Sequence, residues 1–173
     1  MVRGPAIPEN ETREQLVTNL DLPATIVELA GATPQRVLDG RSLMPLFTDA
    51  NAAWRTAFLV EGNDVVEGDE DGGQAGYYAG VRTAGDLYAE HVDLTGAYTG
   101  NEFYDLAADP FELESRPDDP DYAQTVAALK QQLNALESCA GASCFVAGAP
   151  GAHKVGETWR AGDRTVTIAQ AIQ

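Results

Sequence analysis

The chain has 173 residues, enough for one compact domain, and 44% of them are apolar, enough for a hydrophobic core. It carries 27 acidic residues against 11 basic ones, a formal net charge of −16. This balance argues against nucleic-acid binding, because phosphate recognition depends on Lys and Arg, and against adhesion to anionic membranes. No apolar run approaches the roughly 20 residues of a membrane-spanning helix, so neither nucleic acid nor membrane is an expected partner.

The first predicted helix begins at Asp21, which we expect to cap it, with Pro23 in its first turn. Gly31 is expected to end it. Such a short helix must be held by packing rather than by intrinsic propensity. The apolar residues predicted to form its buried face are Ile26, Leu29 and Ala30.

The middle of the chain has the character of an antiparallel sheet. Ala84-Gly85-Asp86 suits a tight hairpin between two alternating segments. Residues 62–76, rich in Gly, Asp and Glu, are predicted to form a flexible acidic loop. The predicted strands are Ala57–Glu61, Tyr77–Thr83, Leu87–Asp93 and Glu102–Leu106.

An amphipathic helix over residues 120–138 is the clearest helical pattern in the chain. Asp118-Asp119-Pro120 provides an acidic cap followed by proline in the first turn. The apolar stripe, which we expect to cover one face of the strands, consists of Tyr122, Val126, Leu129, Leu133 and Leu136.

The two cysteines, Cys139 and Cys144, are separated by four residues that include Gly141, so the chain is able to turn back between them. A small-loop disulfide in an oxidising compartment is the favoured interpretation. Two free thiols are the main alternative. A metal site needs more ligands than His153 alone provides nearby, and a redox pair more often has two intervening residues.

A direct search for catalytic patterns finds neither a Gly-x-Ser-x-Gly elbow nor a glycine-rich phosphate loop. His91 and His153 are the only histidines and do not form a spaced metal pair. Asp69-Glu70-Asp71-Gly72 resembles a calcium loop superficially, but its glycine comes too early for that pattern.

Three charged residues are candidates for facing a cleft: Glu61, Arg41 and Arg82. Arginine presents a planar fork of donors that matches sulfate or phosphate. The alternative for all three is an ordinary ion pair or a surface charge. Asp118 and Asp119 form an acidic pair that helix capping explains better than acid–base catalysis.

Several motifs occur together in a recognisable order. They are Asp21-Leu22-Pro23-Ala24-Thr25 within residues 19–31, Asp39-Gly40-Arg41-Ser42-Leu43, and Glu102-Phe103-Tyr104-Asp105-Leu106 followed by Asp109-Pro110. In this order they resemble the C-terminal third of a type I sulfatase, in the alkaline-phosphatase-like superfamily. The ending with Cys139 and Cys144 is similar to the arylsulfatase and N-acetylglucosamine-6-sulfatase branch.

The resemblance implies an α+β fold, in which the end of an alkaline-phosphatase-like α/β domain is followed by a small antiparallel sheet packed by a C-terminal helix. Residues 1–52 would be the remnant of the catalytic domain. Residues 53–144 would form the C-terminal subdomain. Residues 145–173 would be a linker or tail.

The resemblance also implies a parent enzyme that hydrolyses sulfuric esters. Its formylglycine would come from a Cys/Ser-x-Pro-x-Arg motif, and a calcium ion would polarise the sulfate. Neither Cys139 nor Cys144 is followed by that proline and arginine. No catalytic or metal-binding residue is therefore transferred to this chain, and its substrate-binding residues stay unknown.

Three hypotheses follow. The first is a C-terminal sulfatase fragment, inactive alone, whose partner is the missing N-terminal catalytic region or a separate chain that carries it. The parent would act on a sulfated small molecule or sugar and be secreted, periplasmic or at the cell surface, although the segment after Met1 lacks a signal-peptide core. The second is an acidic, non-catalytic module that binds a protein or a carbohydrate. The third is a fragment of a related phosphatase or phosphonate hydrolase.

The first two hypotheses differ in the surface that they predict. A fragment should expose apolar surface within residues 1–50, where missing strands would pack. An autonomous module should instead bury those residues in a core of its own.

Overall fold

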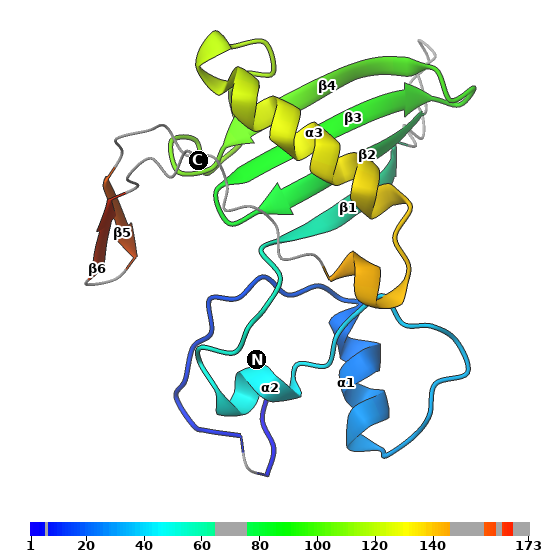
Figure 1. Ribbon diagram of the computed structural model, residues 1–173, viewed down its shortest axis with the longest axis vertical. Coiled ribbons are helices and arrows are strands. Elements are labelled where there is room, and N and C mark those ends of the chain that lie inside the picture. Colours follow the sequence, from blue (N-terminus) through cyan, green and yellow to red (C-terminus); the bar gives the residue numbers. More distant parts are fainter. Residues whose placement is uncertain (6, 65–75, 146–157, 162–163, 168–173) are drawn as a thin grey trace, which may run out of the picture.

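The computed structural model describes residues 1–5, 7–64, 76–145, 158–161 and 164–167 (Figure 1). Most of the predicted acidic loop and His153 lie outside these residues. Within the predicted tail, two short strands, β5 (Thr158–Ala161) and β6 (Arg164–Thr167), pair with each other in an antiparallel hairpin.

A four-stranded antiparallel sheet forms the centre of the molecule, with its strands in the order β1-β2-β3-β4. The sequence predicted all four strands; the structure extends each of them by one to four residues and ends β4 at Asp105, one residue before the predicted end. The turn between β2 and β3 is held by Thr83, whose hydroxyl oxygen accepts hydrogen bonds from the backbone of Gly85 and Asp86. The strands are β1 (Ala57–Asp64), β2 (Gly76–Thr83), β3 (Asp86–Asp93) and β4 (Tyr98–Asp105).

Helix α3 (Ala123–Glu137) lies across one face of this sheet (Figure 1). It follows a short 3-10 turn, Pro120–Tyr122, whose first backbone groups are capped by Asp119 as the sequence predicted. Four of the five residues of the predicted apolar stripe are buried, and Val126 packs against them from the edge. The core between the helix and the sheet contains Ala57, Val81, Tyr88, Phe103, Tyr122, Leu129, Leu133 and Leu136. The predicted α+β fold is confirmed.

Helices α1 (Asp21–Leu29) and α2 (Met44–Thr48) lie together beyond the end of the sheet where β1 begins (Figure 1). Two expectations for α1 are wrong. Leu20 occupies the N-cap position and no side chain caps the helix, because the Asp21 carboxylate is committed to other partners. The helix also buries Asp21, Ala24 and Thr25 and leaves the predicted apolar face exposed.

Candidate functional site

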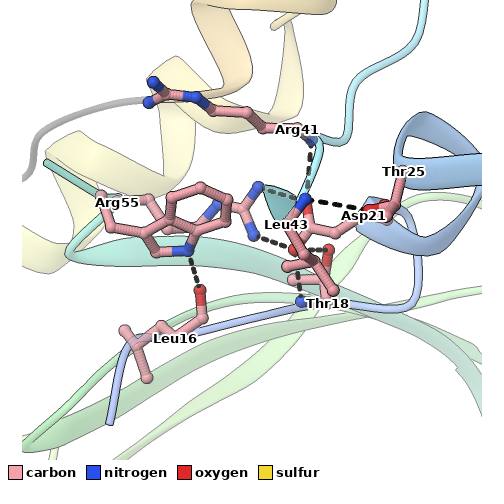
Figure 2. A network of polar contacts seen from close by, with 8 residues as sticks. Leu16, Thr18, Asp21, Thr25, Arg41, Leu43 and Arg55 are labelled. Carbon is pink, nitrogen blue, oxygen red and sulfur yellow. Dashed lines mark hydrogen bonds and ion pairs between the residues drawn. The ribbon is translucent and has the colours of Figure 1, made fainter. Parts of the chain in front are cut away.

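The junction between the N-terminal helices and the sheet is built around the carboxylate of Asp21, which is fully buried (Figure 2). The Arg55 guanidinium binds it in a two-pronged arrangement, with Nη1 2.6 Å from Oδ2 and Nη2 2.6 Å from Oδ1. The backbone N–H groups of Thr18 and Arg41 each donate to it over 2.8 Å. Four strong donors therefore converge on one carboxylate.

These donors determine the charge state of Asp21. Burial alone raises the pKa of a carboxyl group, because it disfavours the ionised form. Here the hydrogen bonds from Arg55, Thr18 and Arg41, together with the Arg55 charge, outweigh burial and hold the pKa of Asp21 below its ordinary value of 3.8. The junction therefore contains a permanent, buried ion pair at neutral pH.

Helix α1 is attached to the following segment by a second set of contacts. The Thr25 hydroxyl donates to the carbonyl of Asp21 over 2.7 Å and accepts from the Leu43 backbone over 2.9 Å. A side chain at position 40 would collide with the carbonyl of Leu20, so glycine is required there. The Asp-Gly-Arg-Ser-Leu motif thus has a structural role in docking this segment beneath α1.

Arg41, one of the three candidates for facing a cleft, lies over aromatic rings. Its guanidinium carbon is 4.4 Å from the ring centre of Phe145 and 5.3 Å from that of Trp54. Arg55 lies 4.8 Å from the same Phe145 ring, and the Trp54 indole donates to the carbonyl of Leu16 over 2.7 Å. These contacts join residues on both sides of the predicted boundary at residue 52.

The turn that contains the two cysteines completes the junction. Cys139 and Cys144 are joined by a disulfide. Within this turn Gly141 has a φ of 59°, a conformation that favours glycine. Its backbone N–H donates to Asp39 over 2.7 Å, which ties the turn to the segment after α1.

The junction holds α1 with an apolar surface facing outward. We define the α1 surface as the exposed residues Leu20, Leu22, Ile26, Leu29 and Val37. Ile26 is 64% exposed and Leu29 is 66% exposed, although both belong to the helix. A helix at a protein surface normally turns such residues toward the core, so the outward orientation of Ile26 and Leu29 is unusual.

The other residues singled out from the sequence fall into separate places. Glu61 lines a hollow of about 550 Å³ at the junction, which Arg55 and Tyr78 also line. Arg82 and His91 lie on the sheet face opposite α3, where they pair with Glu112 and Glu102. The structure thus brings Arg82 and His91 together and leaves Glu61 and Arg41 apart from them.

Sequence reasoning missed the central pair of the junction, Asp21 and Arg55. An acidic residue followed by Pro two positions later has the signature of a helix cap, and nothing in the sequence distinguishes a cap from a buried ion pair. Among the residues that the structure describes, no three His, Cys, Asp or Glu side chains gather as a metal site would require. No described helix has the length and apolar character to cross a membrane.

Comparison with known proteins gives the chain its family. The family model described as the C-terminal region of N-sulphoglucosamine sulphohydrolase matches residues 1–139. The chain belongs to this sulfatase family. The resemblance inferred from the motifs is confirmed.

Curated relatives are consistent with this assignment. The chain is 30% identical over 173 residues to N-acetylglucosamine-6-sulfatase of Homo sapiens, covering 86% of this chain and 31% of the relative. The identity to the Capra hircus protein of the same name is 30%, covering 83% and 30%. An extracellular sulfatase SULF-1 homolog of Drosophila melanogaster is 34% identical over 65 residues, covering 35% and 6%. The chain therefore spans about a third of the length of the first relatives.

Solved structures support the fold. A putative sulfatase from Bacteroides thetaiotaomicron aligns with a TM-score of 0.60 at 20% identity, covering 87% of this chain and 34% of that one. A protein described as a 2-O GAG sulfatase aligns with a TM-score of 0.60 at 24% identity, covering 76% and 27%. At these identities the likeness concerns the fold.

Proposed function

We propose that this chain is the C-terminal region of a sulfuric ester hydrolase, that it is inactive alone, and that its α1 surface docks against the catalytic region of the enzyme. The observation that carries the proposal is the outward-facing apolar side of α1, held in place by a buried ion pair. Family relatives are about three times longer than this chain, which leaves room for the region that would cover that surface.

The physical argument rests on which side of α1 is buried. Its inner side is committed to Asp21 and Thr25, and the partners of both residues belong to this chain. The outer side presents Leu22, Ile26 and Leu29, each at least half exposed. Covering such side chains contributes about 1 kcal/mol for each one removed from water. The α1 surface therefore favours association with an apolar partner surface.

Catalytic chemistry is assigned to the region outside this chain. No cysteine or serine of the sequence is followed by proline at the second and arginine at the fourth position, as formylglycine formation in this family would require. Among the described residues, no three His, Cys, Asp or Glu side chains gather. We therefore derive no reaction step for this chain and assign formylglycine and calcium to the full-length parent.

The substrate and location of the parent are part of the same proposal. The 30% identical relative from Homo sapiens is named for a sulfated amino sugar, which supports a sulfated sugar as the substrate class. The relative from Drosophila melanogaster is named an extracellular sulfatase. A disulfide between Cys139 and Cys144 fits an oxidising compartment, which supports export of the parent.

Two measurements test the proposal. The isolated chain, given an aryl sulfate and calcium, should show no turnover, and clear turnover would overturn the assignment of catalysis to another region. The isolated chain should also bind a dye specific for exposed apolar surface. The double variant Ile26→Asp/Leu29→Asp should lower that binding several-fold without changing the circular dichroism spectrum.

A matched control is the double variant Leu94→Asp/Leu113→Asp, which alters two leucines of comparable exposure on the sheet half of the chain. It should leave most of the dye binding in place. A monomeric wild-type chain that binds no dye and unfolds sharply would argue against docking and for an autonomous acidic module.

A further inference from the structure

Strand β1 forms an open edge of the four-stranded sheet (Figure 1). It pairs with β2 on one side, and the part of the chain that the structure describes places no strand on its other side. The opposite edge is partly covered, because the Phe103 carbonyl of β4 accepts from the Arg116 N–H over 2.8 Å and the Phe103 N–H donates to the Ser115 hydroxyl over 3.2 Å. β1 also contains neither Lys nor Pro, which commonly protect a strand edge. Its backbone groups are therefore open to pairing with a further strand.

The hollow of about 550 Å³ at the junction, which we call the β1 hollow, lies along this open edge. Four consecutive residues of β1, Phe58–Glu61, line it. Side chains of a strand alternate between the two faces of a sheet, so an unbroken run of strand residues lines a hollow only where the hollow follows the strand edge. The facing walls include Leu20 before α1, Leu136 of α3 and Cys139 of the disulfide turn. An extended chain thus has room beside β1.

The charges around the β1 hollow favour a cationic occupant. Three exposed carboxylates line it, those of Asp39, Glu61 and Glu137, and none of them belongs to an ion pair among the described residues. The one Lys or Arg among the described lining residues is Arg55, which is 5% exposed and has both terminal nitrogens bound to Asp21. Helix α3 ends beside the hollow without a basic residue in its last turn, so the negative end of its dipole adds to the acidic charge.

We propose that the β1 hollow binds an extended segment of a partner polypeptide that carries Lys or Arg at alternate positions and adds to the sheet as a strand beside β1. Backbone hydrogen bonds to β1 supply the pairing, and the alternate cations meet the carboxylates of the rim. A second copy of this chain is a poorer occupant, because two β1 edges side by side would set their acidic rims against each other. The proposal does not depend on the proposed function, since the backbone of β1 and the carboxylates beside it carry the argument.

The test is a titration of the ¹⁵N-labelled full chain with synthetic peptides, followed by amide chemical shifts. A strand advances about 3.3 Å per residue, so a peptide of about seven residues covers the part of β1 that lines the hollow and extends past both ends. The probe is acetyl-Thr-Lys-Val-Arg-Val-Lys-Thr-amide, which places its cations on one side of an extended chain. It should cause saturable shifts at Phe58–Glu61. It should also slow hydrogen exchange at alternate β1 amides, those that point away from β2.

Two control peptides separate strand pairing from charge. In acetyl-Thr-Glu-Val-Glu-Val-Glu-Thr-amide the pattern is kept and the charge is reversed, so it should bind at least about tenfold more weakly. In the second control, the basic peptide carries N-methyl groups on its central Val, Arg and Val residues, which keep the charge and block hydrogen bonding along both edges of the peptide. It should also bind at least about tenfold more weakly and leave the exchange of the β1 amides unchanged.

Variants of the chain test the acidic rim. Glu61→Lys should weaken the basic peptide about fivefold, because it replaces an attraction with a repulsion of similar size. Glu28→Lys makes the same change at an exposed position of α1 and should leave the binding unaltered. The peptide comparisons on the wild-type chain decide the matter even if Glu61→Lys fails to fold.

Four results would each overturn the proposal: no saturable shifts along β1, an acidic peptide that binds as tightly as the basic one, an N-methylated peptide that binds as tightly as its parent, or equal effects of the two Glu→Lys variants. Protection of the same β1 amides that rises with protein concentration, without any peptide, would assign the edge to a second copy of this chain and overturn it as well.

Discussion

Replacing Asp21 by Asn tests the buried junction most directly. The substitution preserves the shape of the side chain but removes its charge and points an amide N–H₂ group toward donors. The side chain of Arg55 is only 3% exposed and would lose its counter-charge. Breaking one partner of a buried ion pair costs about 3–5 kcal/mol. Since small domains are typically stable by about 5–15 kcal/mol, this loss would be a large fraction of the total.

The same variant predicts a change in pH dependence. The folded-state pKa of Asp21 lies below the ordinary value of 3.8, as described above. The stabilisation from the ionised carboxylate is therefore fully present above the unfolded-state pKa, and it is lost as the pH falls through the folded-state pKa. The stability difference between wild type and Asp21→Asn should stay constant from pH 7 to about pH 5 and shrink below pH 4.

Urea unfolding measures both effects when it is followed by far-ultraviolet circular dichroism and by tryptophan fluorescence, since Trp54 lies beside Arg55. Asp49→Asn is the control, because Asp49 is exposed and its Oδ1 accepts only a local backbone hydrogen bond. The control should change the free energy of unfolding by less than about 0.5 kcal/mol. A loss of under 1 kcal/mol for Asp21→Asn at pH 7, or a loss that persists unchanged at pH 3, would refute the reasoning.

Three further predictions concern the turn, the core and a glycine. Cys144→Ser should lower the free energy of unfolding by about 2 kcal/mol, the expected contribution of a disulfide that closes so short a loop. Thiol titration of the denatured wild-type chain should find no free thiol, and finding two free thiols would contradict the disulfide. Leu133→Ala should cost about 2–5 kcal/mol, because this side chain is 1% exposed between α3 and the sheet; Leu113→Ala, at an exposed site, should change urea unfolding by less than about 0.5 kcal/mol. Gly40→Ala should cost more than Gly100→Ala in the same assay, since a methyl group at residue 40 meets the Leu20 backbone and one at residue 100 meets nothing within 4 Å; equal losses would mean that close packing at position 40 is unimportant.

Local pattern was enough to predict the sheet and α3. Alternating residues in β2 and β3 must place one set of side chains toward a core, and the stripe from Tyr122 to Leu136 must cover that set. Both patterns are repeats between residues close in sequence. The spacing of apolar residues is therefore enough to predict which side of each strand and of the helix is buried. The strand ends were less well predicted, because pairing with an adjacent strand extends β4 back to Tyr98.

The orientation of α1 could not be predicted in the same way. The spacing of its apolar residues indicates which side of the helix should be covered. It does not indicate whether the surface that covers that side belongs to this chain. The structure assigns the opposite side of the helix to the interior because Arg55, 34 residues further on, supplies the charge that allows Asp21 to be buried. The ring contacts of Arg41 could not be predicted for a related reason, since one of the rings that it covers belongs to the distant Phe145.

Motif order in the sequence by itself determined the family, and residue periodicity determined the order of strands and helix. Only the tertiary structure decided that α1 turns an apolar side outward, and that Arg82, His91 and Glu102 share one face of the sheet. The physical reason is that periodicity reports contacts between residues one or two turns apart. Burial of a charge, and the meeting of side chains from three strands, depend on groups that the fold brings together from far along the chain.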